Sequence, residues 1–385
     1  LVFVDPNGSK ARTTVWDRSS VRGAALSGAM AQEAACAETF APNPLGTLLG
    51  NGGRWGTWDA AAVRWEGDVE AVFAHREVEV AASGFRYTEG PTWVDAERCL
   101  LFSDTIDARI YKWSDGTAFP LVERSGGYDG ANVSDHDRLF EPGSNGMTLA
   151  GADVYICQHP THRVVKVALS DLLKVPPGTP FCDASLTRDV VDRVGATGRR
   201  LNCPNDVVVG PDGAVWFTDP VYGFLELDLD NRYVPRQPLQ PEGHNPGDLP
   251  YLDELCASRG AGVTGVYRWK DGEAQLVIDC LERPNGLAFD GTTLWVANSL
   301  ASEATWVAFD ATVLLQGGNV ELPLVPKVTL NETILGEMPG PGLSDGFRID
   351  DEHRIWSSMP SGIVVIDTLW QKVIAKVIFN CNTSN

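Results

Sequence analysis

Five segments with a shared pattern recur along the chain, and they restrict the fold more than any other feature of the sequence. Most place a polar residue beside a small one, continue with an apolar alternation, turn at acidic residues or glycine, and end in a second strand with an aromatic residue. The segments begin at Phe85, Gly143, Cys203, Arg283 and Leu343. Repeats of this length, with two clear strands and two weaker ones, are typical of the four-stranded blades of a β-propeller.

The polar position of the repeat recurs at steps of 56, 60, 80 and 60 residues. A stretch rich in Pro, Asp and Glu between Leu225 and Gly262 explains the long step, and we interpret it as a surface loop. In a propeller the innermost strand of each blade begins near the central channel, so the polar side chains should meet at one end of it. These side chains are Glu89, Asn145, Asn205, Asn285 and Asp345.

The sequence changes at Val78 from an irregular pattern to short apolar alternations, and we predict two regions. Residues 1–77 form an irregular N-terminal extension, with one Ala-containing stretch compatible with a helix. Residues 78–385 form the propeller domain, in which short apolar alternations are bounded by Gly, Pro, Asn and Asp.

Aromatic and acidic residues at fixed places in the repeats favour structural roles. Four tryptophans lie in or beside the paired strands and are expected to pack between blades: Trp93, Trp216, Trp295 and Trp356. By contrast, Asp104, Asp115 and Asp271 are interpreted as loop and turn residues.

Charge and cysteine content exclude several classes of function. The net charge of −20 at pH 7 argues against binding to a nucleic acid or an anionic membrane, because both would be repelled. No run of eighteen apolar residues is present, and we expect a soluble protein, either cytoplasmic or secreted. The 8 cysteines include no CxxC pair, which weighs against a zinc cluster. Most cysteines should be buried as small hydrophobic residues, and one or two disulfides in a secreted form are the alternative.

A ring of carboxylate and amide oxygens without His or Cys suits Ca²⁺ or Mg²⁺ better than a metal that prefers soft ligands. Such a cation, bound with open coordination positions, would polarise a carbonyl or phosphoryl oxygen and assist hydrolysis. The alternative is that Asn and Asp before Gly are turn residues, which repeats would also propagate. Periodicity alone leaves both interpretations open.

The motifs "YTEGPTWV", "LNCPNDVVVGPDGAVWFTDPVYG", "RPNGLAFDG" and "SDGFRIDDEHRIW" resemble, in order, the blade motifs of the gluconolactonase and regucalcin-like family, which includes luciferin-regenerating enzyme. The resemblance covers approximately residues 78 to 385. It implies a six-bladed β-propeller with one divalent cation in the central channel and hydrolysis of lactones. The expected cation is Ca²⁺, with Zn²⁺, Mg²⁺ or Mn²⁺ as alternatives.

The resemblance also implies roles for individual residues. The metal ligands would be Glu89, Asn205, Asn285 and Asp345, and Asp345 would in addition be the general base that acts on water. His159 in "ICQH" resembles a histidine of the lactonase branch and is predicted as a second catalytic residue, by donating to the developing oxyanion or relaying a proton. Substrate-binding residues would be Asn145, Asp219 and Tyr222, and Asp206 would support Asn205.

One departure from the family pattern concerns the sixth blade. The chain ends at "VIFNCNTSN", and we expect a C-terminal truncation as the sixth blade begins, with residues around 66 to 82 adding one or two strands to ring closure. The sequence therefore predicts a metal-dependent hydrolase of a small-molecule lactone, with no nucleic-acid or membrane partner. It does not determine the oligomeric state. The alternatives are a phosphotriesterase-type hydrolase and a non-catalytic calcium-binding propeller.

Overall fold

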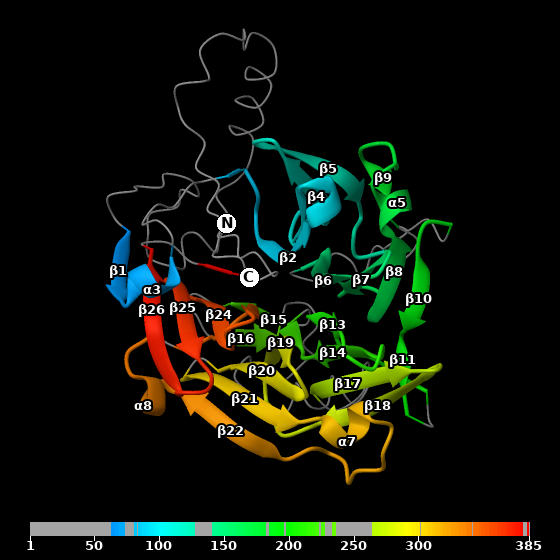
Figure 1. Cartoon of the computed structure of the whole chain (residues 1–385). Helices are drawn as coiled ribbons and strands as arrows, with labels where there is room; N and C mark the ends of the chain where they lie inside the picture. The colour runs from blue at the N-terminus through cyan, green and yellow to red at the C-terminus, as the bar shows by residue number, and fades with distance from the viewer. Residues whose placement is uncertain are drawn as a thin grey trace, which may run out of the picture.

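A computed structural model gives the fold, which consists mainly of strands with a few short helices. It describes residues 63–73, 81–82, 84–127, 141–181, 185–195, 198–222, 225–227, 233–235, 264–300, 302–340, 342–379 and 383–384. Five sheets of four or five strands are arranged around a common centre, as Figure 1 shows. The predicted all-β propeller architecture is confirmed.

The first three blades are antiparallel meanders whose first strand lies nearest the centre. Blade 1 contains β2 (Thr88–Val94), β3 (Cys99–Asp104), β4 (Arg109–Ser114) and β5 (Thr117–Glu123), with β9 (Thr179–Pro180) added parallel to β5. Blade 2 contains β6 (Ser144–Ala150), β7 (Asp153–Gln158), β8 (Arg163–Ala168) and β10 (Arg188–Val191). Blade 3 contains β13 (Val207–Val209), β14 (Val215–Asp219), β17 (Gly265–Lys270) and β18 (Glu273–Ile278).

The last two blades repeat this order. Blade 4 contains β19 (Pro284–Asp290), β20 (Thr293–Ser299), β21 (Ala304–Asp310) and β22 (Pro326–Asn331). Blade 5 contains β23 (Phe347–Ile349), β24 (Arg354–Met359), β25 (Gly362–Asp367) and β26 (Lys372–Ile378). Two small hairpins lie between blade strands: β11 (Arg193–Val194) with β12 (Arg199–Arg200), and β15 (Leu225–Leu227) with β16 (Tyr233–Pro235). The short helices are α3 (Val69–Val72), η3 (Asp95–Glu97), α5 (Leu169–Leu172), α7 (Thr312–Leu315) and α8 (Glu332–Leu335).

The predicted number of blades is wrong for the described residues, which form five blades and not six. Each blade corresponds to one of the five sequence repeats, and the sixth was expected from the family resemblance alone. The innermost strands contact one another in the order β2, β6, β13, β19 and β23. Near the C-terminus, Ser384 Oγ donates a hydrogen bond to the carbonyl oxygen of Thr88 over 2.7 Å, which places this end of the chain beside the start of β2.

The N-terminal strand β1 (Arg64–Gly67) does not begin a new blade but extends blade 5. It pairs antiparallel with β26 along its whole length and becomes the outermost strand of that sheet. The helix α3 follows at once, and Phe73 then packs edge-to-face on Trp356 with ring centroids 5.2 Å apart. Part of the region predicted as an irregular extension is therefore ordered against the propeller.

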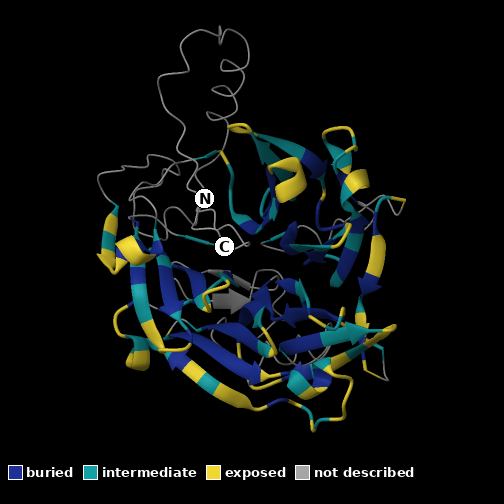
Figure 2. Ribbon diagram, in the orientation of Figure 1, coloured by how far each residue is buried: buried dark blue, intermediate teal, exposed yellow. Residues whose placement is uncertain are grey.

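Hydrophobic cores lie between successive blades, and Figure 2 shows the buried residues concentrated along the inner strands of the sheets. Leu101 of blade 1 and Met147 of blade 2 belong to one such core, and Trp216 of blade 3 and Phe309 of blade 4 belong to another. Packing of sheet faces against each other removes this apolar surface from water, which stabilises the ring. The prediction of buried tryptophans is confirmed for Trp216, Trp295 and Trp356, whereas Trp93 is only half-buried.

The glycines of the repeats let neighbouring blades approach backbone to backbone. A Cβ atom on Gly90 would lie 2.5 Å from the carbonyl oxygen of Asn145, and one on Gly146 would lie 2.5 Å from that of Asn205. A Cβ atom on Gly286 would lie 2.8 Å from the carbonyl oxygen of Asp345. Glycine at positions 90, 146 and 286 is thus required by the next blade, because no side chain fits in that space.

Several predictions fall on residues that the structure does not describe. These are residues 1–62 of the predicted extension and residues 236–263 of the predicted surface loop. Among the described cysteines, Cys99, Cys157 and Cys203 are buried thiols, as predicted, and Cys280 is an exposed thiol. Asp115 and Asp271 adopt left-handed turn conformations, in agreement with their interpretation as turn residues.

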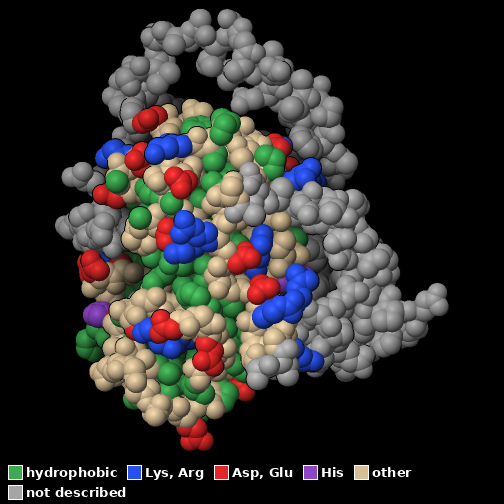
Figure 3. Space-filling view, turned by 90° about the vertical axis from the view of Figure 1, so that its right-hand side faces the viewer, with side chains coloured by type: hydrophobic (Ala, Val, Ile, Leu, Met, Phe, Trp, Pro, Cys, Tyr) green, Lys and Arg blue, Asp and Glu red, His purple; other side chains and the backbone are tan. Residues whose placement is uncertain are grey.

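Acidic and basic side chains are interspersed on the face shown in Figure 3. In the described part of the chain, no helix has the length and apolar character needed to cross a membrane.

Candidate functional site

The five polar residues of the repeats lie at the inner ends of the five blades. Glu89, Asn145 and Asn285 belong to the innermost strands β2, β6 and β19, while Asn205 and Asp345 lie two residues before β13 and β23. The first four are buried, and Asp345 keeps an intermediate exposure. The structure therefore brings together at the centre residues that are up to 256 positions apart in the sequence.

Hydroxyl groups on the second strand of a blade hold these motifs in place. Ser103 donates a hydrogen bond over 2.9 Å to the carbonyl oxygen of Asn145 in the next blade. Ser299 donates over 2.7 Å to the carbonyl oxygen of Ser344, directly before Asp345. Short hydroxyl side chains are suited to this place because they reach a neighbouring backbone without filling the channel.

Two of the predicted ligands are carboxyls that face a shared, poorly solvated space. Burial, followed by the negative charges of Asp345, Glu141 and Asp206, raises the pKa of Glu89 well above its ordinary value. Burial, followed by the charge of Glu141, also raises the pKa of Asp345 to about 7, while a hydrogen bond with the Asn285 side chain opposes this rise. The carboxyls of Glu89, Asp345, Glu141 and Asp206 are therefore close enough to repel one another.

Asp206 does not have the role predicted for it. Its carboxyl accepts hydrogen bonds from the amides of Val207 over 2.9 Å and of Leu287 over 3.4 Å, and it lies 3.6 Å from the guanidinium of Arg348. Within the described residues, no hydrogen bond joins this carboxyl to the Asn205 side chain. The third repeat carries Asp where the four others carry Gly after the polar residue, and this carboxyl bridges to the next blade instead.

Glu141 is a residue of this site that the sequence pattern did not identify. One of its oxygens, Oε2, lies 3.0 Å from Nδ1 of His159 and accepts a hydrogen bond from Nδ2 of Asn145 over 3.4 Å. The contact with His159 is close but lacks the alignment of a hydrogen bond. Glu141 stands four residues before Asn145 and outside the repeated positions, so periodicity could not single it out. His159 itself is completely buried behind it.

The contacts of Asp219 and Tyr222 are with backbone groups that precede the motifs. Oδ2 of Asp219 accepts a hydrogen bond from the amide of Asn202 over 2.8 Å, and the hydroxyl of Tyr222 donates to the carbonyl oxygen of Arg283 over 3.3 Å. Asp104 at the end of β3 does the same for blade 1, because it accepts from the amides of Arg86 and Tyr87. The interpretation of Asp104 as a loop residue was therefore wrong. The predicted contacts of Asp219 and Tyr222 with the substrate stay predictions.

Asp219 should make the stability of the fold depend on pH. Burial raises its pKa to about 8, although the amides of Asn202 and Cys203 favour the charged form. Because the folded-state pKa lies above that of the unfolded chain, this group stabilises the fold fully below pH ~4 and loses about 1.4 kcal/mol per pH unit as the pH rises toward 8. Asp219→Asn keeps an acceptor for Asn202 but cannot ionise. Urea unfolding at pH 5, 6, 7 and 8 should show the variant gaining stability relative to the wild type as the pH rises. A difference that stays constant across this range would mean that Asp219 is ionised throughout.

The residues at the centre have the chemistry of a site for a hard cation. Two of the four central carboxyls lie beside a basic side chain: Asp206 beside Arg348, and Glu141 beside His159. Glu89 and Asp345 form no ion pair with a basic side chain of the described residues. Two carboxyls with raised pKa values beside two amide oxygens suit a divalent cation that prefers oxygen ligands. No group of three or more His, Cys, Asp or Glu side chains in the described ranges is arranged to hold a metal ion. The predicted set of two carboxyls and two amides stays a prediction.

Comparisons with known proteins show which proteins this chain resembles. Residues 87–384 match the model of the SMP-30/Gluconolactonase/LRE-like region, which includes every predicted site residue. A gluconolactonase of Zymomonas mobilis is 30% identical over 294 residues, which cover 75% of this chain and 68% of the relative. A solved gluconolactonase structure from Xanthomonas campestris superimposes with a TM-score of 0.52 at 25% identity, over 78% of this chain and 79% of that chain.

Proposed function

The chain belongs to the SMP-30/gluconolactonase/LRE-like family, and from this premise we propose that it is a metal-dependent hydrolase that opens lactones. The observation that carries the proposal is the pair of carboxyls Glu89 and Asp345, which meet at the centre of the propeller with amide side chains beside them. A lone cluster of this kind would be costly to bury, because the charge of Asp345 raises the pKa of Glu89 and burial raises the pKa of both carboxyls.

The cation would be held by the side-chain oxygens of Glu89, Asn205, Asn285 and Asp345, and we expect Ca²⁺ before Zn²⁺, Mg²⁺ or Mn²⁺. When bound, it supplies a positive charge that polarises the lactone carbonyl. The four residues come from four blades, so the geometry of the site depends on how the blades pack against one another.

Asp345 is proposed as the base that removes a proton from the attacking water. The hydrogen bond with Asn285 fixes the orientation of its carboxyl, and its amide donates to the carbonyl oxygen of Ser358 over 3.3 Å. A carboxyl whose pKa is about 7 accepts a proton near neutral pH more readily than an ordinary one. A cation beside it would lower this pKa and keep the carboxyl ionised.

The other predicted residues are proposed as contributors to substrate binding and orientation. Asn145 lies at the inner end of β6, and its side chain contacts Glu141. Asp219 and Tyr222 are proposed to shape the site through the segments before Asn205 and Asn285 that they hold. His159 is fully buried against Glu141, so we propose that its contribution passes through that carboxyl.

The proposal is tested by assaying the purified protein against lactones, aryl esters and phosphotriesters. Samples are first treated with EDTA and then supplied with Ca²⁺, Mg²⁺, Mn²⁺ or Zn²⁺ in turn. We expect lactone opening that disappears on chelation and returns with one or more of these cations. Turnover that survives chelation would contradict the metal dependence, and a preference for phosphotriesters would favour the alternative hydrolase. Cation binding without hydrolysis of any of these substrates would identify a binding protein.

A further inference from the structure

The innermost strands of the propeller are irregular at the polar motifs. In β19 the register shifts between Pro284 and Leu287, a stretch that contains Asn285, and β2 and β6 shift at the same place of their motifs. A bulge leaves backbone groups without a partner in their own ladder, and a buried amide then needs another acceptor. The amide of Leu287 finds this acceptor in blade 3, because it donates to Oδ2 of Asp206 over 3.4 Å. The segment of blade 4 that carries Asn285 thus depends on a side chain of the preceding blade.

The segment of Asp206 is fixed by its own blade and by blade 2. The amide of Asn205 donates to the carbonyl oxygen of Thr218 over 2.9 Å, and the amide of Asp206 donates to the Thr218 hydroxyl over 3.0 Å. From blade 2, the amide of Gly146 donates to the carbonyl oxygen of Asn205 over 2.7 Å. Oδ1 of Asp206 accepts from the amide of Val207 over 2.9 Å. The Asp206 carboxyl is therefore held in one place, with both of its oxygens engaged.

A guanidinium of blade 5 reaches the same carboxyl. Arg348 lies on the innermost strand β23, and its Nη1 is 3.6 Å from Oδ2 of Asp206. The same nitrogen donates a hydrogen bond to the carbonyl oxygen of Phe347 over 2.7 Å, which anchors the guanidinium to its own blade. Oδ2 of Asp206 therefore contacts the backbone of blade 4 and a side chain of blade 5 at once.

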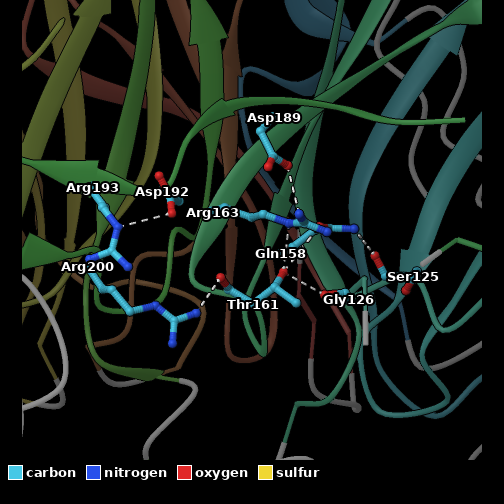
Figure 4. A network of polar contacts seen from close by, with 9 residues as sticks. All are labelled: Ser125, Gly126, Gln158, Thr161, Arg163, Asp189, Asp192, Arg193 and Arg200. Atoms are coloured by element: carbon cyan, nitrogen blue, oxygen red, sulfur yellow. Dashed lines mark hydrogen bonds and ion pairs between the residues drawn. The ribbon is translucent and has the colours of Figure 1, made fainter. Parts of the chain in front are cut away.

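This ion pair differs from all others in the described part of the chain, because it joins two blades that are not neighbours in the ring. Two other arginine–aspartate pairs each lie within a single blade. Figure 4 shows one of them, Arg163 of β8 with Asp189 of β10, 2.7 Å apart. Arg354 and Asp350 of blade 5 are also 2.7 Å apart. A pair inside one sheet stabilises that sheet, whereas a pair between blades 3 and 5 constrains the spacing across the ring.

Each of the three joined groups follows a proposed cation ligand within three residues of the chain. The ligands are Asn205, Asn285 and Asp345, from blades 3, 4 and 5, and the groups that follow them are Asp206, Leu287 and Arg348. A shift of one segment would therefore move its ligand oxygen relative to the other two. Groups behind the ligands of a metal commonly determine its affinity in this way.

Resting on the proposed function, we infer that Asp206 and Arg348 form a brace across the ring, which holds three of the four proposed ligands at the spacing that the cation requires. Both are positioning residues. The oxygens of Asp206 accept backbone hydrogen bonds, and the brace acts on the segments that carry the ligands rather than on the Asn205 side chain. The fourth ligand, Glu89, comes from blade 1 and lies outside the brace.

Calorimetric titration with Ca²⁺ separates the brace from a simple effect of charge. Arg348→Gln should weaken binding by about 10- to 100-fold, the range that loss of a group behind a metal ligand produces. Charge alone predicts the reverse, because removal of a positive charge near the site would strengthen the binding of a dication. Arg348→Lys keeps the charge but loses the fork of donors, and its affinity should lie between those of the wild type and Arg348→Gln.

A double variant tests whether the two residues act as one unit. Asp206→Asn with Arg348→Gln should bind Ca²⁺ no more weakly than the weaker of the two single variants. If charge alone mattered, the two changes would cancel and the double variant would bind as the wild type does. Tighter binding by Arg348→Gln, wild-type affinity in both Arg348 variants, or this cancellation would overturn the brace.

The matched control is Arg354→Gln, which breaks a largely buried ion pair inside blade 5. Urea unfolding should show that it loses stability, as Arg348→Gln does, whereas its Ca²⁺ affinity should equal that of the wild type. A loss of affinity in the control as large as that in Arg348→Gln would mean that affinity only follows stability, and would overturn the brace.

Hydrogen exchange followed by mass spectrometry in EDTA tests the brace without any cation. In Arg348→Gln, peptides that cover residues 204–209 and 284–289 should exchange about three- to tenfold faster than in the wild type, because the contacts between them are loosened. Arg354→Gln should change exchange within blade 5 alone. Unchanged exchange in blades 3 and 4 of Arg348→Gln would overturn the brace. The expected exchange pattern in a protein that binds no cation and opens no lactone would instead overturn the proposed function.

Discussion

Asp345→Asn should lower kcat for lactone opening by about 10²- to 10⁴-fold, the range that loss of a general base produces. The substitution keeps an oxygen for the cation and for the hydrogen bond with Asn285, but it removes the group that accepts the proton from water. KM should therefore change far less than kcat, because the interaction that is lost belongs to the transition state. Steady-state kinetics with saturating Ca²⁺ measure both constants.

The matched control for this substitution is Asp351→Asn, an exposed residue of the turn after β23. It should leave kcat and KM unchanged. The variant at position 345 should unfold at the same or a higher urea concentration than the wild type in EDTA, because it loses the repulsion from Glu141 and Asp206. A fall in kcat of less than about tenfold, with the fold intact, would show that another group removes the proton.

Glu89→Gln should weaken cation binding by about 10²-fold or more, since removal of one charge in contact with a dication is worth several kcal/mol even at an effective dielectric constant of about 20. Glutamine still offers an oxygen, so high concentrations of Ca²⁺ should restore a large part of the lactone turnover. Isothermal titration calorimetry gives the affinity, and turnover measured over a range of Ca²⁺ concentrations gives the restoration.

The control here is Glu97→Gln, on the exposed η3 turn of the same blade. It should bind the cation as the wild type does. In EDTA, Glu89→Gln should be at least as stable as the wild type, because the buried carboxyl with its raised pKa is replaced by a neutral group. Unchanged cation affinity would exclude Glu89 from the ligand set, whereas a loss of turnover that no Ca²⁺ concentration restores would give it another role.

The architecture and the inner polar positions were accessible from the sequence because both are periodic. A strand-turn-strand unit that recurs five times predicts a propeller, and equivalent positions in equivalent blades must converge on one axis. The five repeats correspond to the five described blades, whereas the expectation of a sixth blade came from the family resemblance and from no sixth repeat. The strand β1 was located only approximately, since a four-residue strand that joins a distant sheet carries little local pattern.

The residues that sequence analysis missed act through contacts that periodicity does not encode. Glu141 reaches the site from the segment before β6, and only its partners His159 and Asn145 reveal it. Asp104 could have been found, because it ends the second strand of its blade as Asp219 does, and aligning "FSDT" with "FTDP" exposes the equivalence. Both carboxyls hold backbone amides, a role that turn chemistry alone does not distinguish from an exposed loop residue.

The pairing of β1 with β26 determines how the protein can be shortened for laboratory use. A version that begins at residue 78, the boundary suggested by the sequence, would lack β1 and α3 and leave the free edge of β26 and the ring of Trp356 uncovered. Open strand edges recruit other chains, so such a version should aggregate during expression. Starting at or before residue 63 keeps this edge paired, and an affinity tag placed ahead of β1 would then lie on the outer rim of blade 5.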